Sequence, residues 1–192
     1  AMVMIGLEPL TSFTDNTDEA LVANTIFEDV VSDCLGQHTW NFATGQKTLS
    51  RLTDVPVDRW DSAYALPTNP AVIQVQTVTI EDVPQQYDIY ERNVFINAEE
   101  DDTVVLNYVF RPETQHWPPT FTMWVIFRLA SVFALSVTRK GDIAQSYTQL
   151  AEGQFRRAKA RDSQQVTNQN LRLSRYHRAR LGNGIYQNIE GT

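Results

Sequence analysis

Hydrophobic and polar positions repeat with two different periods along this chain, and the periods predict where helices and strands lie. Apolar residues recur at helical spacing in three stretches, which predict helices over residues 17–36, 118–139 and 142–169. Between the first two helices, short runs rich in alternating apolar residues predict strands at 40–44, 49–55, 64–66, 72–80, 87–90, 94–96 and 104–110. This order predicts an α+β protein in which a small antiparallel β domain is inserted into a helical bundle.

Capping and turn residues suggest where these elements begin and end. Asp18 and Glu19 follow Thr17 in a first helical turn, where negative charge is favourable, and Gly36 is a candidate stop. Arg92-Asn93 is a candidate tight turn between two strands. Asp142 is the expected N-cap of the last helix. About two residues then separate the last two helices, so they should form an antiparallel hairpin.

The same pattern divides the chain into four parts. Residues 1–16 are an expected extended N-terminal arm, 17–39 with 117–169 the helical bundle, 40–116 the β insertion, and 170–192 an extended C-terminal tail. The bundle core is expected to contain large apolar side chains from all three helices, namely Phe27, Val31, Trp124, Phe127, Phe133, Tyr147 and Phe155.

Composition allows such a core, because 42% of the 192 residues are hydrophobic. The net charge of −7 is unevenly distributed. Residues 156–180 contain eight basic residues and one acidic residue, which leaves eight basic and 22 acidic residues elsewhere. This asymmetry favours a basic interaction tail on an acidic body, and it argues against a protein whose whole surface binds phosphates.

The sequence gives little indication of export, membrane insertion or disulfide bonding. The first apolar stretch is short and lacks the basic start and cleavage site of a signal peptide, so none is expected. The most apolar run, residues 121–137, contains Arg128 and is expected to be a buried helix, with no membrane contact. The single cysteine, Cys34, is expected to be a small buried side chain.

The usual signatures of catalysis are missing from the sequence. His38, His116 and His177 form no metal-binding or nucleophile-activating pattern, and the glycines form no phosphate-binding loop. The acidic run at 99–102 is a candidate metal site, but adjacent side chains in a short loop mostly point apart. We therefore expect no catalytic residue, cofactor or metal. An enzyme, such as a nuclease or wall hydrolase, would need the acidic run or Glu152 to converge with a base.

Three stretches carry a distinctive order of residues. They are Trp40-Asn41-Phe42-Ala43-Thr44, then WDSAYALP at 60–67 with VIQV at 72–75, and finally a helix pair with Pro118, Phe121, Phe127, Ala130, Ala134, Ala158, Ala160 and Asp162. In this order they resemble segments of the tail tubular protein A family, the head-to-tail connector adaptors of podoviruses. The resemblance covers about residues 17–165, with the best match in 40–75 and 117–162. The chain departs from the family in its short first-helix region, and Asn69-Pro70 stands where an acidic residue and a cysteine are common.

The resemblance implies a structural protein of the virion, made in the host cytoplasm. Members of this family form a homo-oligomeric ring, commonly of twelve subunits, between the portal protein and the tail nozzle (tail tubular protein B). Double-stranded DNA passes through the ring without sequence readout. The apolar helix at 121–137 has more hydrophobic surface than one partner helix covers, so the flanking helix faces are expected to meet the next subunit.

The C-terminal tail is the expected portal contact. Its predicted interface residues are Arg172, Arg175, Tyr176, Arg178, Arg180 and Tyr186, because arginines and tyrosines are common anchors at protein interfaces. The same arginines could instead contact DNA. The alternatives are therefore another phage head-completion or stopper protein, or a DNA-binding module that uses the basic tail.

Overall fold

The computed structural model describes residues 1–165 except 55 and 57, and it confirms a mixed α+β protein. Its helices are α1 (Asp18–Gly36), α2 (Pro119–Ser136) and α3 (Gly141–Ser163), with 3-10 turns at Met2–Ile5 (η1), Asn41–Ala43 (η2) and Thr114–His116 (η3). Its strands are β1 (Thr44–Thr48), β2 (Ser62–Ala65), β3 (Val72–Ile80), β4 (Val83–Pro84), β5 (Asp88–Tyr90), β6 (Asn93–Ile96) and β7 (Val104–Phe110).

The strands form two antiparallel sheets. One has the order β1-β7-β3-β4, and the other has the order β2-β6-β5. Alternate residues of β7 are buried because one face of this strand packs on the core of the β domain, which includes Val78, Val94, Ile96 and Leu106. The β domain therefore has a hydrophobic core of its own.

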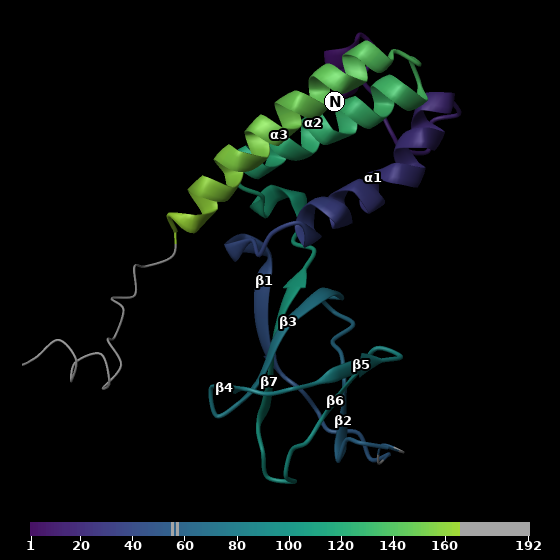
Figure 1. Ribbon diagram of the computed structural model, residues 1–192. Helices are drawn as coiled ribbons and strands as arrows, with labels where there is room; N and C mark the ends of the chain where they lie inside the picture. Colours follow the sequence, from purple (N-terminus) through teal and green to yellow (C-terminus); the bar gives the residue numbers. More distant parts are fainter. Residues whose placement is uncertain (55, 57, 166–192) are drawn as a thin grey trace, which may run out of the picture.

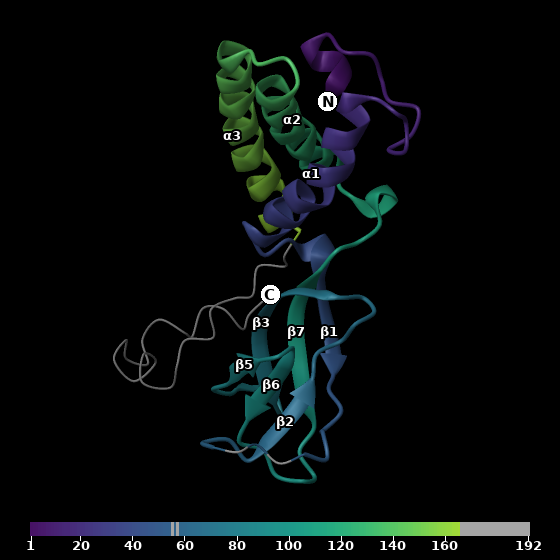
Figure 2. The same cartoon turned by 90° about the vertical axis from the view of Figure 1, so that its right-hand side faces the viewer.

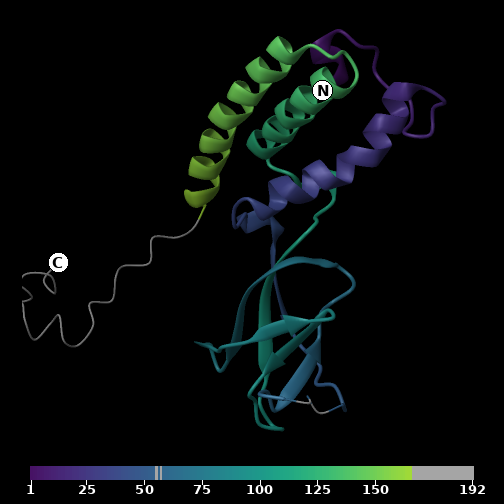
Figure 3. The same ribbon diagram turned by 45° about the vertical axis from the view of Figure 1, so that its right-hand side comes forward.

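The helices form a separate layer in which α2 is central. It packs along α3, to which residues 137–140 connect it, and it also contacts α1 and η1. Figure 3 shows α2 between α1 and α3, with η1 near the loop that joins α2 to α3. The β domain extends from the opposite end of this layer (Figures 1 and 2), where α1 contacts β3 and β7.

Several predicted boundaries in the β domain were wrong. The run at 40–44 is not a strand, because Asn41–Ala43 is a 3-10 turn and β1 begins at Thr44. The run at 49–55 forms no strand among its described residues; only Arg51 makes an isolated bridge, with Tyr64. The tight turn is Glu91-Arg92 and not Arg92-Asn93, since Tyr90 pairs with Asn93 and both turn residues have positive φ.

The N-terminal region and the helix ends also differ from the predictions. Residues 1–16 are not simply extended, because Met2 and Ile5 of η1 are buried and Tyr147 Oη donates to the Met4 carbonyl at 2.6 Å. Lys140, not Asp142, is the N-cap of α3, and Gly36 is the last residue of α1 and not a left-handed stop. The predicted end of the last helix at 169 lies outside the described residues.

Candidate functional site

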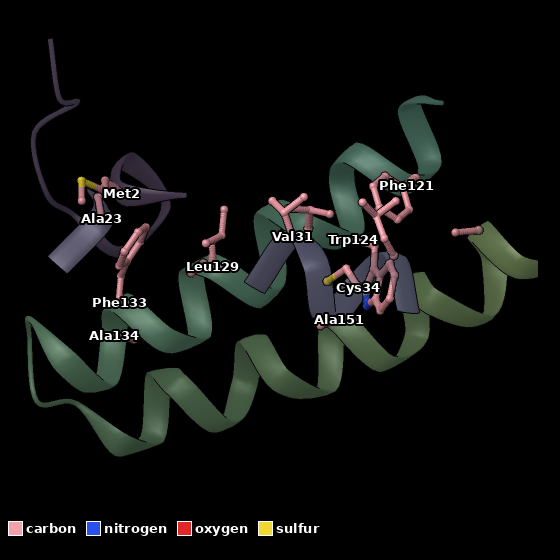
Figure 4. Packing of buried hydrophobic residues seen from close by; sticks show 14 of the residues in the cluster. Met2, Ala23, Val31, Cys34, Phe121, Trp124, Leu129, Phe133, Ala134 and Ala151 are labelled. Carbon is pink, nitrogen blue, oxygen red and sulfur yellow. The ribbon is translucent and has the colours of Figure 1, made fainter. Parts of the chain in front are cut away.

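The helical core is built around α2. Figure 4 shows Trp124, Leu129 and Phe133 among the side chains between the helices. Of the seven predicted core residues, Val31, Trp124 and Phe133 are buried. The other four are half-buried and pack against this core: Phe27, Phe127, Tyr147 and Phe155.

Trp40 joins this core to the β domain. It is only 1% exposed, and its indole Nε1 donates to the Cys34 carbonyl near the end of α1 at 3.0 Å. Its ring lies 5.1 Å from Phe121, 5.6 Å from Trp124 and 6.1 Å from Phe155, measured between ring centroids. Tilted and edge-to-face aromatic contacts of this kind are favourable beyond the area they bury. The segment that leads into β1 is therefore anchored in the helices.

A second link at the same joint comes from Asp162, which is only 5% exposed on the last turn of α3. Its carboxylate accepts the Asn41 backbone N–H, with both oxygens at 3.2 Å, and the Asn41 Nδ2 at 3.1 Å. The Asp162 carbonyl also accepts from Asn41 Nδ2 at 2.9 Å. Residues 121 positions apart in sequence thus connect the end of α3 to the start of the β domain.

His38 lies beside this link, with its Nε2 3.9 Å from the Asp162 carboxylate. Burial and the nearby Lys159 cation lower the pKa of His38, while Asp162 opposes them. The imidazole is therefore neutral near pH 7, and its edge lies against Trp40 with ring centroids 4.9 Å apart. This environment suits a structural histidine.

Cys34 is fully buried between α1 and α2. Burial raises the pKa of its thiol to about 12, so the reactive thiolate is scarce at neutral pH. Next to it, Arg128 of α2 forms an ion pair with Asp33 of α1 at 2.9 Å. Arg128 is the one charged residue of the apolar helix α2, and the ion pair with Asp33 explains how this helix accommodates it.

The candidate metal-binding groups do not gather in the described part of the chain. Residues 1–165, apart from 55 and 57, contain no group of three or more His, Cys, Asp or Glu side chains that could hold a metal ion. In the acidic run at 99–102, Asp102 Oδ2 accepts the Glu99 backbone N–H at 2.8 Å, which closes an exposed loop. Glu152 is exposed on α3, far along the chain from that loop.

By length and composition alone, α2 could cross a membrane. Core helices of soluble proteins meet the same criterion, and seven side chains of α2 are buried against other elements of this chain. Two large apolar side chains of α2 remain exposed to solvent: Met123 is 37% exposed and Leu135 is 64% exposed. These positions are candidates for contacts with another protein surface.

The predicted portal-contact residues lie outside the described residues; they are Arg172, Arg175, Tyr176, Arg178, Arg180 and Tyr186. Sequence reasoning did not identify the contact between Asp162 and Asn41, since no local signal indicates which residue a distant carboxylate will meet. No protein-family model matches this chain, and no curated protein matches it in a sequence search.

Proposed function

We propose that this chain is a structural head-to-tail adaptor of a short-tailed bacteriophage, forming a ring that joins the portal to the tail nozzle and lets DNA pass. In this proposal the three helices form the bundle of the ring, with α2 and α3 as its hairpin. The β domain at 40–116 is the inserted platform, and 170–192 is the portal-docking tail.

The observation that carries the proposal is the joint around Trp40. The two parts of the chain that most resemble the adaptor family, 40–75 and 117–162, meet there through Trp40, Phe121, Trp124 and Phe155. Residues that a family uses for catalysis would be expected around a polar cleft, whereas these side chains pack a hydrophobic core and fix the β domain on the helices. A packed joint between the two parts is consistent with an adaptor that must connect two rings.

The test is direct observation of assembly. The full chain is mixed with the portal protein encoded by the same phage, and the mixture is examined by size-exclusion chromatography with light scattering and by negative-stain microscopy. We expect a ring seated on the portal, with an open channel. A closed channel would indicate a stopper instead, and no binding to the portal would contradict the proposal.

Deletion of residues 170–192 tests the role assigned to the tail. We expect the truncated chain to lose portal binding, and the binding of the full chain to weaken as salt rises, because arginine–carboxylate contacts are screened. Undiminished portal binding by the truncated chain would contradict this role.

DNA binding is the second candidate, because Arg156, Arg157, Lys159 and Arg161 are exposed on the last two turns of α3. We favour the portal because each neutralised phosphate adds affinity, and tight binding would hinder the passage of DNA. A gel-shift assay with double-stranded DNA at physiological salt separates the two, since only a DNA-binding module should shift the DNA.

A further inference from the structure

We propose that neighbouring copies of this chain meet through two oppositely charged flanks of the helical layer, one on α1 and one on α3. The acidic flank consists of Asp18, Leu21, Thr25 and Asp29. The basic flank consists of Leu150, Arg157 and Arg161. This inference rests on the proposed ring and specifies which surfaces close it.

The acidic flank is one stripe of α1. Its four residues are three or four positions apart, so they follow one another along a single side of the helix. All four are exposed, and Leu21 is 67% exposed. The opposite side of α1 buries Ala20, Ala23, Val31 and Cys34. Glu28 and Asp33 are paired with Arg111 and Arg128, but Asp18 and Asp29 form no ion pair with another described residue.

The basic flank is a stripe on the outer helix, α3. Arg157 and Arg161 follow Leu150 by seven and eleven positions, which keeps them on one side of the helix. Leu150 is 51% exposed, and within residues 1–165 no carboxylate pairs with either arginine. Hence both an apolar side chain and two cations remain open to a partner.

Met123 adds apolar surface beside Leu150. Gln154 Nε2 donates to the Thr120 carbonyl at 3.0 Å, and the ring of Phe127 lies 6.2 Å from that of Tyr147. These two contacts set the antiparallel register of α2 and α3. Met123 and Leu150 fall between them, along the same seam.

The two flanks cannot meet within one chain, because α2 lies between α1 and α3 (Figure 3). The positive charge of Lys159 lowers the pKa of His38, which lies just beyond the end of α1. Lys159 therefore marks the side of α3 that is nearer to His38. Arg157 and Arg161 are each two positions from Lys159, about 200° around the helix, so they project to the side away from His38. A copy placed on that side would present its α1 flank to these arginines.

Because the two flanks carry opposite charges, contact between the α3 flank of one chain and the α1 flank of its neighbour is favoured. Two α1 flanks or two α3 flanks would repel each other, whereas α3 against α1 attracts. Such a heterologous contact closes a ring when it is repeated by rotation. The C-terminal ends of α1 and α3 lie at the same end of the helical layer, because the Asn41–Asp162 contact joins them there. Arg157 and Arg161 therefore lie level with the half of α1 that carries Asp29.

Charge reversal tests the contact in the full chain. One variant carries Arg157→Glu with Arg161→Glu, another carries Asp18→Lys with Asp29→Lys, and a matched control carries Lys47→Glu with Arg51→Glu in the exposed part of the β domain. Ring formation is measured by sedimentation and negative-stain microscopy, with and without the portal protein. We expect each flank variant to lower ring yield about tenfold or more, and the control to assemble like the unmodified chain.

Mixing the two flank variants in equal amounts should restore rings in which the variants alternate, because each contact then pairs opposite charges, either the new glutamates with the new lysines or the native arginines with the native aspartates. Restoration also shows that both variants are folded. Rings from the unmodified chain together with unchanged assembly of each flank variant would overturn the flank contact and leave the adaptor proposal standing. Failure of the mixture to restore rings would overturn the charge pairing. No ring from the unmodified chain, alone or with portal, would overturn the adaptor proposal and this inference together.

Cross-linking gives a second readout. A variant with Arg157→Lys and Arg161→Lys keeps the charge and allows carbodiimide coupling to carboxylates. In a mixture of nitrogen-15-labelled and unlabelled chains, we expect cross-links between differently labelled chains that join positions 157 or 161 to Asp29. Cross-links confined to other positions would overturn the proposal. It would also be overturned if the variant with Arg157→Glu and Arg161→Glu lost DNA binding but still formed rings.

Discussion

The link between α3 and the β domain can be tested at Asp162. Asp162→Ala removes the carboxylate that accepts the Asn41 backbone N–H at 3.2 Å, but it leaves the 2.9 Å bond from Asn41 Nδ2 to the main-chain carbonyl. Hydrogen bonds to a charged acceptor contribute about 1.5–3 kcal/mol. Removing a carboxylate that is 5% exposed returns part of its desolvation cost. We therefore expect the free energy of unfolding to fall by about 2 kcal/mol.

Urea unfolding of the full chain, followed by far-ultraviolet circular dichroism and by tryptophan fluorescence, measures this loss. Coincident transitions would justify a two-state analysis. For a chain of this size the melting temperature should fall by roughly 4–8 °C. Asp162→Asn keeps an acceptor and should lose about half as much, whereas Glu152→Ala, on the exposed face of α3, should stay within about 0.5 kcal/mol. A loss at Asp162→Ala no larger than at Glu152→Ala would refute the reasoning.

Three further outcomes follow from the buried groups. Because burial raises the pKa of Cys34 to about 12, the thiol should resist a thiol reagent at pH 8 until urea unfolds the chain; rapid labelling of the folded protein would contradict this. The pKa of His38 is lowered from 6.5, so the unfolded chain takes up the proton first, and stability should fall as pH drops below about 6.5. This part of the pH dependence should be absent in His38→Gln, and equal slopes for both proteins would contradict it. Trp124→Ala should cost about 3–5 kcal/mol in urea unfolding, and a loss no larger than that of Trp124→Phe would show that the site repacks.

Elements with a strong local pattern were predicted well. The strands β3 and β7 span the predicted residues 72–80 and 104–110, because β-branched and alternating apolar side chains favour a half-buried strand wherever it lies. The start of α1 was also predicted, since the Thr17 hydroxyl accepts the Ala20 backbone N–H as a local cap.

Predictions failed where a distant contact decides the local conformation. Trp40 and Phe42 were expected on a strand, but both pack against the helical core, and a 3-10 turn places them there. Residues 1–16 mix apolar residues with polar ones and turn formers, so no periodicity marks a helix there, yet Met2 and Ile5 become buried in a 3-10 turn that packs against α2. The two-residue strand β4 depends on the positive φ of Glu81 and Asp82, which no periodicity signals.

The sequence by itself therefore determined the α+β class, the central apolar helix and the uneven charge, because each depends on residue type and spacing within one segment. Only the tertiary structure decided which segments meet. It joined Asp162 to Asn41 across 121 positions, and it placed the acidic stripe of α1 and the basic stripe of α3 on different flanks of α2. Contacts between distant segments depend on how whole helices and sheets pack together, and this information is not contained in the spacing of neighbouring residues.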